Sequence, residues 1–169
     1  VSLSVAAHNG LCAAHIAMFG TEAQKRQYLV PLATGVWIGA WGLTEPTAGS
    51  DAAAIRVSAA RDGDGWVIDG AKTFITHGSI GDVMVVMAVT EKARAHRGIS
   101  AFIVERGNPG MTPGRKEDKL GMRASDTSEV IFDQCRIPGS AIIGAPGEGF
   151  LQVMQVLDAG RIGIAAQAL

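Results

Sequence analysis

The ten residues from Gly42 to Asp51, GLTEPTAGSD, combine groups that can bind an anionic ligand. Thr44 and Ser50 carry hydroxyls that both donate and accept hydrogen bonds. Gly49 allows the backbone to approach a bulky ligand closely, and the amides of such a turn can form a concave site that suits phosphate. The same residues also fit an ordinary surface turn, with Asp51 as the cap of the AAAI segment that follows. Turn chemistry alone favours the surface turn.

A second pair of candidate residues, Asp158 and Arg161, lies in the segment LDAGR near the end of the chain. On a helix this spacing of three places both side chains on one face. They can then bind a ligand together, or form a surface ion pair worth ~0.2–0.5 kcal/mol. Spacing alone favours the ion pair.

The histidines and cysteines do not have the spacing of a metal site, so no metal is expected. His8 and His15 are two helical turns apart on a predicted helix that offers no third ligand. Cys12 and Cys135 have no CxxC partner, and we expect both to be small packing residues in a reducing compartment.

Composition and charge exclude several classes of protein. The 169 residues are 47% hydrophobic and 18% charged, which favours a sizeable core over disorder. A net charge of −1 without a run of Lys or Arg gives no electrostatic basis for binding nucleic acid or an anionic membrane. The most basic stretch, GRKEDK at 114–119, is expected to be a solvated loop. No apolar run is long enough to span a membrane and no signal peptide is visible, so we expect a soluble intracellular protein.

The hydrophobic pattern predicts helices, then strands, then a helix. Helical spacing covers 1–19 and 22–34, with Thr21 as the cap of the second helix and Pro31 as a late stop or kink. Strands are predicted at 36–44, 56–61, 65–76, 83–90, 98–106 and 128–138, and the turn DGDG joins two of them as a hairpin. Helical spacing returns from Phe150.

This order predicts an α+β multidomain fold with a central antiparallel β-barrel-like domain. We expect residues 1–35 to be the end of an N-terminal helical domain and 36–143 to be a middle β domain. Residues 144–169 are then the first helix of a truncated C-terminal helical bundle. The chain has no initiating Met and its last helical pattern has no stop signal, so we expect a fragment of a longer protein.

Five blocks of the sequence together resemble the acyl-CoA dehydrogenase family. GLTEPTAGSDAAA resembles the family signature, with Thr47 where the family usually has Gly. GAKTFITHG is similar to the strand G-x-K-x-W/F-I-T-N, with Phe74 in the aromatic place and His77 in place of Asn. The other blocks are FGTEAQKRQYLVPLATG, DKLGMRASDTSEVIFDQCRIP and GEGF…LDAGRIGIAAQAL, which resemble segments of the N-terminal, β and C-terminal domains. The resemblance covers essentially the whole chain in order.

The resemblance implies that the protein binds FAD. The backbone around Trp41, Leu43 and Thr44 would contact the edge of the flavin ring, which needs an apolar wall and a few hydrogen bonds. Phe74 and Ile75 would form the wall of the ring, and Thr76 would hydrogen-bond near its redox-active nitrogen. Without the resemblance, Phe74 would be read as a core aromatic and Thr76 as a strand-end hydroxyl bonded to nearby backbone. His77 could either bond the cofactor or end the strand.

The resemblance also implies an acyl-CoA substrate. Ser50 would lie where the pyrophosphate of FAD and the acyl-CoA chain pass, and Asp158 and Arg161 would bind the coenzyme A arm. The implied reaction is α,β-dehydrogenation to 2-enoyl-CoA, in which a carboxylate removes the α-proton while the β-hydride passes to the flavin. Electrons then pass to an electron-transfer flavoprotein.

No catalytic residue is expected within these 169 residues. Most family members place the Glu base far along the C-terminal domain, and a minority place it beside the Arg, where this chain has Gly160. Glu45 lies inside the flavin signature, where a structural role is expected, and Glu148 is expected to be a helix-start acid.

Family members are homotetramers or dimers, so the same assembly is expected here. A bacterial cytoplasmic location is expected, with the mitochondrial matrix as the alternative. Two other functions stay open at this point. One is an acyl-CoA oxidase or flavin monooxygenase of the same fold, and the other is a non-catalytic β-barrel binding module, which would show no flavin spectrum.

Overall fold

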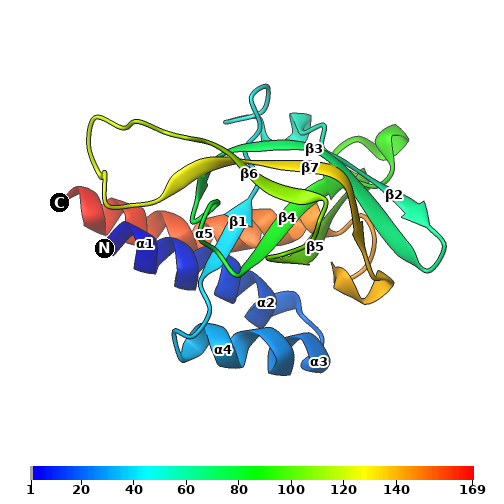
Figure 1. Cartoon of the computed structure of the whole chain (residues 1–169), viewed down its shortest axis with the longest axis horizontal. Coiled ribbons are helices and arrows are strands. Elements are labelled where there is room, and N and C mark those ends of the chain that lie inside the picture. The colour runs from blue at the N-terminus through cyan, green and yellow to red at the C-terminus, as the bar shows by residue number, and fades with distance from the viewer. Residues whose placement is uncertain (1) are drawn as a thin grey trace.

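A computed structural model describes residues 2–169 and shows helices packed against one side of a curved sheet (Figure 1). The first helix consists of α1 (Ser2–Ala7), a π-helical segment η1 (His8–Ala13) and α2 (Ala14–Phe19). The second consists of α3 (Glu22–Gln24), a π-helical segment η2 (Lys25–Leu29) and α4 (Val30–Ala33). Both predicted N-terminal helices are therefore present, except that residue 1 lies outside the described part of the chain.

Thr21 caps the second helix as the sequence predicts. Its hydroxyl accepts a hydrogen bond from the Gln24 amide at 3.2 Å, and the Gln24 side chain accepts one from the Thr21 amide at 2.9 Å. The Gln24 side-chain nitrogen also donates to the carbonyls of Ser140 and Ile142, both at 2.8 Å. The capping residue Gln24 therefore also attaches the second helix to residues 140–142.

Pro31 does not end the second helix, which continues to Ala33. Proline lacks the amide hydrogen that a regular helical turn requires. The π-helical segment η2 ends at Leu29, two residues before Pro31, and a π-bulge is one way in which a helix accommodates an irregular residue.

Eight strands form one sheet, in the order β6-β7-β3-β2-β4-β5-β8, with β1 also paired to β4. The strands are β1 (Gly39–Gly42), β2 (Ser58–Asp62), β3 (Gly65–Thr76), β4 (Val83–Val89), β5 (Ile99–Glu105), β6 (Met111–Lys116), β7 (Thr127–Ile137) and β8 (Ile142–Ile143). The DGDG hairpin joins β2 to β3, with Gly63 at φ +56° in the turn, where glycine is favoured. The sheet confirms the predicted α+β class.

The sheet differs from the prediction in three places. β1 and β2 each run parallel to β4, so the sheet is mixed rather than wholly antiparallel. The expected loop at 114–119 begins inside β6, whose side chains are largely exposed because β6 is an edge strand paired only with β7. β8 has two residues, which is too short for a periodic signal.

The sheet separates two hydrophobic cores. One lies inside the curve of the sheet, where Trp66 of β3 meets Phe102 of β5 edge-on, with ring centroids 5.2 Å apart. The other lies between the sheet and the helices and contains Cys12 and Ile16 of the first helix. β1 contributes to both, because successive side chains of a strand point to opposite faces: Ala40 joins the inner core and Trp41 the helix-facing core.

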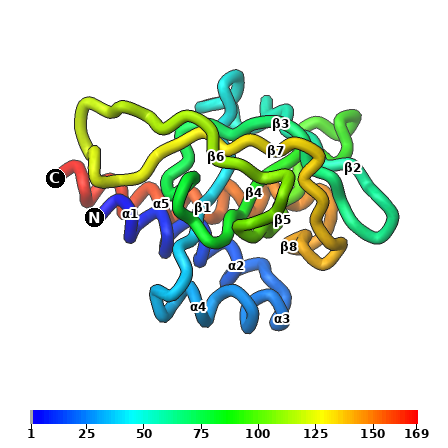
Figure 2. The backbone as a smooth tube through the Cα atoms, viewed as in Figure 1, coloured from blue at the N-terminus to red at the C-terminus, as the bar shows by residue number. Residues whose placement is uncertain are grey.

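The C-terminal helix α5 (Gly149–Ala168) completes the helical layer. Its buried side chains include Gln152, Val153 and Val156, and it packs against α1, η1 and α2. Figure 2 shows the two ends of the chain on the same side of the molecule, where α1 and α5 lie together. The first and last segments of the sequence thus share one face of the sheet.

A buried ion pair fixes the loop that follows β1. Lys72 of β3 is fully buried, and its ammonium lies 2.8 Å from the Glu45 carboxylate and donates to the Leu43 carbonyl at 3.0 Å. Glu45 also accepts hydrogen bonds from the amides of Arg56 and Val57. Burial lowers the pKa of Lys72 to about 8, and the Glu45 carboxylate opposes that shift. These contacts give Glu45 the structural role that the sequence predicts.

Replacing Lys72 by Met should lower the free energy of unfolding by ~3–5 kcal/mol, because the buried Glu45 carboxylate would lose its cation. Urea unfolding followed by circular dichroism measures this loss. Lys25→Met is the matched control, since Lys25 pairs with the exposed Glu22 and such surface pairs contribute ~1 kcal/mol or less. A Lys72→Met variant no less stable than Lys25→Met would contradict the assigned role of the pair.

The two cysteines should not react with a thiol reagent in the folded protein. Both are fully buried, and burial raises the pKa of the Cys12 thiol to about 12 and that of Cys135 to about 11. Alkylation with iodoacetamide at mildly alkaline pH, followed by peptide mass spectrometry, should label both positions only after denaturant is added. Rapid labelling of either cysteine in native buffer would show that the packing described here is wrong.

Candidate functional site

The end of β1 and the end of β3 meet at one cavity of about 160 Å³. Six of the seven residues that the sequence nominates for the cofactor line it, together with Ala7 and Leu11 of the first helix. The six are Trp41, Leu43, Thr44, Phe74, Ile75 and Thr76. Two sequence segments about thirty residues apart are therefore neighbours in space, as a shared ligand would require.

Backbone and side-chain bonds hold these two segments together. The Thr73 amide donates to the Thr44 carbonyl at 2.9 Å, beside the contact from Lys72 to the Leu43 carbonyl. Near its end β3 contains an irregularity between Lys72 and Ile75, where its register with β7 shifts. Phe74 lies at this point with φ +56°, a backbone conformation that an aromatic residue rarely adopts. The irregularity leaves Phe74 63% exposed, while the next residue, Ile75, is buried.

The cavity combines an apolar wall with two free hydroxyls. Thr44 and Thr76 are each half-buried, and within residues 2–169 neither hydroxyl has a hydrogen-bond partner. Polar groups that border a cavity without a protein partner are available to a ligand. The cavity therefore suits an apolar molecule with hydrogen-bonding groups on its edge.

Two histidines hold the beginning of β1 at Gly39. The Gly39 amide donates to Nδ1 of His8 at 2.9 Å, and His8 Nε2 donates to the Leu32 carbonyl at 3.1 Å. On the other side, Nδ1 of the buried His77 donates to the Gly39 carbonyl at 3.0 Å. His77 does not line the cavity, so of its two expected roles the structure supports the one at the end of the strand.

A larger apolar cavity of about 460 Å³ adjoins the first and shares Ala7, Leu11 and Thr76 with it. It lies between the first helix and α5, and its remaining lining residues are Leu3, Ala6, Leu157, Gly160, Arg161, Ile164 and Ala165. Apart from Thr76 and Arg161, these side chains are apolar, so this cavity suits an aliphatic chain.

Asp158 and Arg161 form the ion pair that their spacing predicts, with 2.7 Å between the Arg161 guanidinium and the Asp158 carboxylate. Their side chains are 72% and 68% exposed, and only Arg161 lines the larger cavity. The structure thus places Arg161 at the cavity and Asp158 beside it. Gly160 faces Leu11, whose Cδ2 lies 3.4 Å from the position of an added Cβ.

Ser50 is not brought to either cavity. Reciprocal backbone hydrogen bonds between Glu45 and Ala48 close a tight turn before it, and Ser50 lies in an exposed bend. The short 3-10 helix η3 (Ala52–Ala54) that follows has no side-chain cap from Asp51. A ligand role for Ser50 therefore remains a prediction that depends on a ligand extending beyond the two cavities.

Sequence reasoning missed the helical residues Ala7 and Leu11 as site residues. They belong to an ordinary apolar helical face, and nothing in their spacing distinguishes them from core positions. The sequence also indicated no role for His15, although this residue is fully buried and hydrogen-bonded to Trp41.

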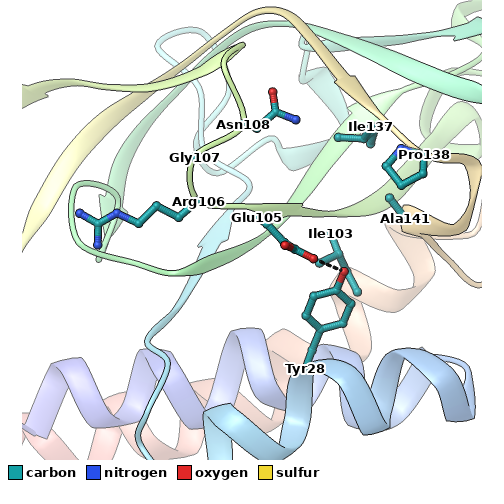
Figure 3. A pocket seen from close by; sticks show the side chains of 9 residues that line it. All are labelled: Tyr28, Ile103, Glu105, Arg106, Gly107, Asn108, Ile137, Pro138 and Ala141. Carbon is teal, nitrogen blue, oxygen red and sulfur yellow. Dashed lines mark hydrogen bonds between the residues drawn. The ribbon is translucent and has the colours of Figure 1, made fainter.

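A third hollow of about 370 Å³ lies between the second helix and β5 (Figure 3). The Tyr28 hydroxyl donates to the Glu105 carboxylate there at 2.8 Å. Burial raises the pKa of Tyr28 above its usual value, and the hydrogen bond and negative charge of Glu105 add to the shift. None of the nominated site residues lies here, so this contact joins helix to sheet.

The described residues offer neither a metal site nor a membrane-spanning helix. No group of three or more His, Cys, Asp or Glu side chains in residues 2–169 is arranged to hold a metal ion. Within the same range, no helix has both the length and the apolar character needed to cross a membrane.

Comparison with known proteins identifies the family. Residues 40–135 match the family model for the acyl-CoA dehydrogenase middle domain, and residues 1–36 match that for its N-terminal domain. The short-chain specific acyl-CoA dehydrogenase of Clostridium acetobutylicum is 51% identical over 165 residues, which are 98% of this chain and 44% of that protein.

Solved structures agree with this match. Butyryl-CoA dehydrogenase from Megasphaera elsdenii superposes with a TM-score of 0.96 at 46% identity, covering 98% of this chain and 44% of that one. A glutaryl-CoA dehydrogenase from Mycobacterium smegmatis, solved in complex with FADH2, gives a TM-score of 0.88 at 39% identity, covering 96% of this chain and 40% of that one. The chain spans less than half the length of these relatives. On these matches, the chain belongs to the acyl-CoA dehydrogenase family.

Proposed function

We propose that this chain forms the flavin ring site and part of the acyl-CoA site of an FAD-dependent acyl-CoA dehydrogenase. The observation that carries the proposal is the meeting of Thr44 and Thr76 at one cavity, next to an apolar cavity bordered by Arg161. The reaction is the α,β-dehydrogenation of an acyl-CoA thioester to a 2-enoyl-CoA.

The residues at the smaller cavity fit a flavin ring. Leu43, Phe74 and Ile75 supply an apolar wall, and the unpartnered hydroxyls of Thr44 and Thr76 can bond the polar edge of the ring. The exposed Phe74 extends the wall beyond the cavity, as a tricyclic ring larger than 160 Å³ requires. When bound, FAD supplies the oxidant that accepts two electrons from the substrate.

The larger cavity fits the acyl part of the substrate. Its helical walls from α1, η1 and α5 are apolar and reach Thr76, so an acyl chain there would end beside the flavin site. Arg161 at the rim can pair with the anionic coenzyme A arm, with Asp158 holding its guanidinium in place. The short-chain specificity of the Clostridium acetobutylicum relative supports a short acyl chain here.

The proton-abstracting base is supplied from outside these residues. No carboxylate in residues 2–169 lines either cavity, and Gly160 occupies the position where a minority of the family places its Glu. The segment therefore binds and orients the flavin and substrate, and a Glu elsewhere in the full-length protein completes the site.

The domain bounds, the role of Ser50, the assembly, the electron acceptor and the location are proposed from the family to which the chain belongs. Residues 1–35, 36–143 and 144–169 belong to the N-terminal, middle and C-terminal domains, and Ser50 contacts the pyrophosphate outside the two cavities. The protein assembles as a homotetramer or dimer, passes electrons to an electron-transfer flavoprotein and acts in the bacterial cytoplasm, with the mitochondrial matrix as the alternative.

The class of reaction is tested on the purified full-length protein. It should show a flavin absorbance spectrum that is bleached by butyryl-CoA under anaerobic conditions, and the electrons should pass to an electron-transfer flavoprotein much faster than to oxygen. Rapid reoxidation by oxygen with peroxide release would indicate an oxidase, and the absence of a flavin spectrum after reconstitution would indicate a binding module.

Replacing Thr76 by Ala should raise the FAD dissociation constant by about two- to tenfold, since one hydrogen bond is worth ~0.5–1.5 kcal/mol. Titration of flavin-free protein with FAD, followed by flavin fluorescence, measures the change. Thr112→Ala is the matched control, because Thr112 is exposed on β6 and lines neither cavity. Equal dissociation constants for the two variants would exclude Thr76 as a flavin contact.

Replacing Arg161 by Gln should raise the KM for acyl-CoA while leaving the flavin spectrum and the FAD dissociation constant unchanged. Arg161 borders only the larger cavity, so its loss removes a charge from the coenzyme A path and not from the flavin site. Arg115→Gln, on the exposed part of β6, serves as the charge-matched control. A normal KM in Arg161→Gln would mean that the residue forms only the surface ion pair with Asp158.

A further inference from the structure

We propose that His15 is a positioning residue for the flavin site: it holds the indole of Trp41 in the wall of the smaller cavity, and Gln152 holds His15 in place. This inference rests on the proposed flavin function. The residues belong to three elements far apart in the sequence: Trp41 to β1, His15 to α2 and Gln152 to α5.

A continuous chain of buried hydrogen bonds joins these residues. The Trp41 indole nitrogen lies 3.1 Å from Nδ1 of His15, and Nε2 of His15 lies 2.9 Å from the Gln152 side-chain oxygen. The Gln152 side-chain nitrogen then donates to the Ile143 carbonyl of β8 at 3.1 Å. His15 is fully buried and Gln152 is nearly so, so no exchange with water loosens these bonds.

The chemistry of the donors fixes the direction of every bond. An indole nitrogen can only donate, so Nδ1 of His15 must be the acceptor and its proton must be on Nε2. Nε2 therefore donates to the Gln152 oxygen, which leaves the Gln152 nitrogen to donate to the backbone of Ile143. Burial lowers the pKa of His15, with the hydrogen bond to Gln152 opposing the shift, and a lower pKa favours this neutral form.

Packing restricts the imidazole from the other side. The Phe19 ring meets His15 edge-on, with centroids 5.5 Å apart, and the Trp41 ring lies at 6.3 Å. The imidazole is therefore bonded through both nitrogens and bordered by two aromatic rings. The indole of Trp41 cannot rotate without breaking its hydrogen bond to His15, which would leave a buried donor without a partner.

The arrangement also connects the two cavities. Trp41 lines the smaller cavity beside Leu43 and Thr44, whose backbone is proposed to meet the flavin edge. Gln152 belongs to the same helix as Gly160 and Arg161, which line the larger cavity. His15 thus sets the position of β1 relative to the helix that carries the substrate side of the site.

Two substitutions at His15 separate its two bonds. In His15→Asn the shorter amide can present its oxygen where Nδ1 lies and keep the bond from Trp41, while in His15→Gln the longer amide can reach the place of Nε2 and keep the bond to Gln152. Each variant loses one of the two hydrogen bonds, so a general loss of stability would affect both. Only a positioning role predicts that the two variants differ in the Trp41 signal and in the FAD dissociation constant.

The experiment uses full-length protein labelled with 5-fluorotryptophan, with the Trp41 resonance identified by its loss in Trp41→Phe. In the flavin-free protein, the ¹⁹F signal of Trp41 should be only slightly broadened in His15→Asn, and shifted or strongly broadened in His15→Gln. The FAD dissociation constant should stay within about threefold of wild type in His15→Asn and rise by more than that, up to roughly tenfold, in His15→Gln, because only His15→Gln loses the bond from Trp41. Equal constants and equal signals in the two variants would overturn the proposal.

A third variant, Gln152→Ala, keeps the His15 imidazole and removes its support from α5. Because it removes the same bond that His15→Asn loses, it should broaden the Trp41 resonance slightly and raise the FAD dissociation constant by no more than about threefold, and an unchanged signal would contradict the role given to Gln152. If wild-type protein binds no FAD, the proposed flavin function fails. The ¹⁹F comparison would still show whether His15 positions Trp41, so the two failures are distinguishable.

Discussion

A four-residue strand, β1, lies between the two hydrophobic cores, and the position of the candidate site depends on it. Its ladder with β4 spans only four residue pairs, so side chains from other elements also hold its backbone and the indole of Trp41. His8 and His77 bond the amide and carbonyl of Gly39, and His15 bonds the indole of Trp41. Just beyond the strand, Lys72 bonds the Leu43 carbonyl and neutralises Glu45. Three of the four histidines in the chain are therefore used to fix one strand.

This constraint explains why the strand approaches the first helix so closely. An added Cβ at Gly39 would lie 2.7 Å from the Sγ of Cys12, so only glycine fits between the strand and η1. With β1 fixed against the helix, the irregularity in β3 turns Phe74 outward and leaves Thr76 facing Ala7 and Leu11. The unusual φ of Phe74 persists because the flanking residues are held, Lys72 by Glu45 and Ile75 by the inner core.

Periodicity and turn chemistry predicted the elements that carry strong local signals. The capped helix after Thr21, the DGDG hairpin and the buried strand at 83–90 are all present. The edge strand β6 contains Pro113 and Gly114 and has largely exposed side chains, so it lacks the alternation that marks a strand. The parallel pairings of β4 depend on contacts between distant segments, which a local pattern does not contain.

The difference between local signals and contacts of distant segments also applies to the site. Thr44, Phe74 and Thr76 were nominated through motifs that resemble a family, and the structure brings them to one cavity. Ser50 belongs to the same motif but lies outward, because the turn between Glu45 and Ala48 reverses the chain before it. His15 could not be singled out, since its bond to Gln152 spans 137 positions and neither residue type indicates the other.

A crystal structure of the flavin-loaded full-length protein tests the central claim most directly. We expect the isoalloxazine to lie between β1 and the end of β3, within hydrogen-bond distance of Thr44 and Thr76, while the Trp41 indole keeps its bond to His15. A flavin ring found elsewhere on the molecule, with the cavity between Thr44 and Thr76 filled by protein side chains, would contradict it.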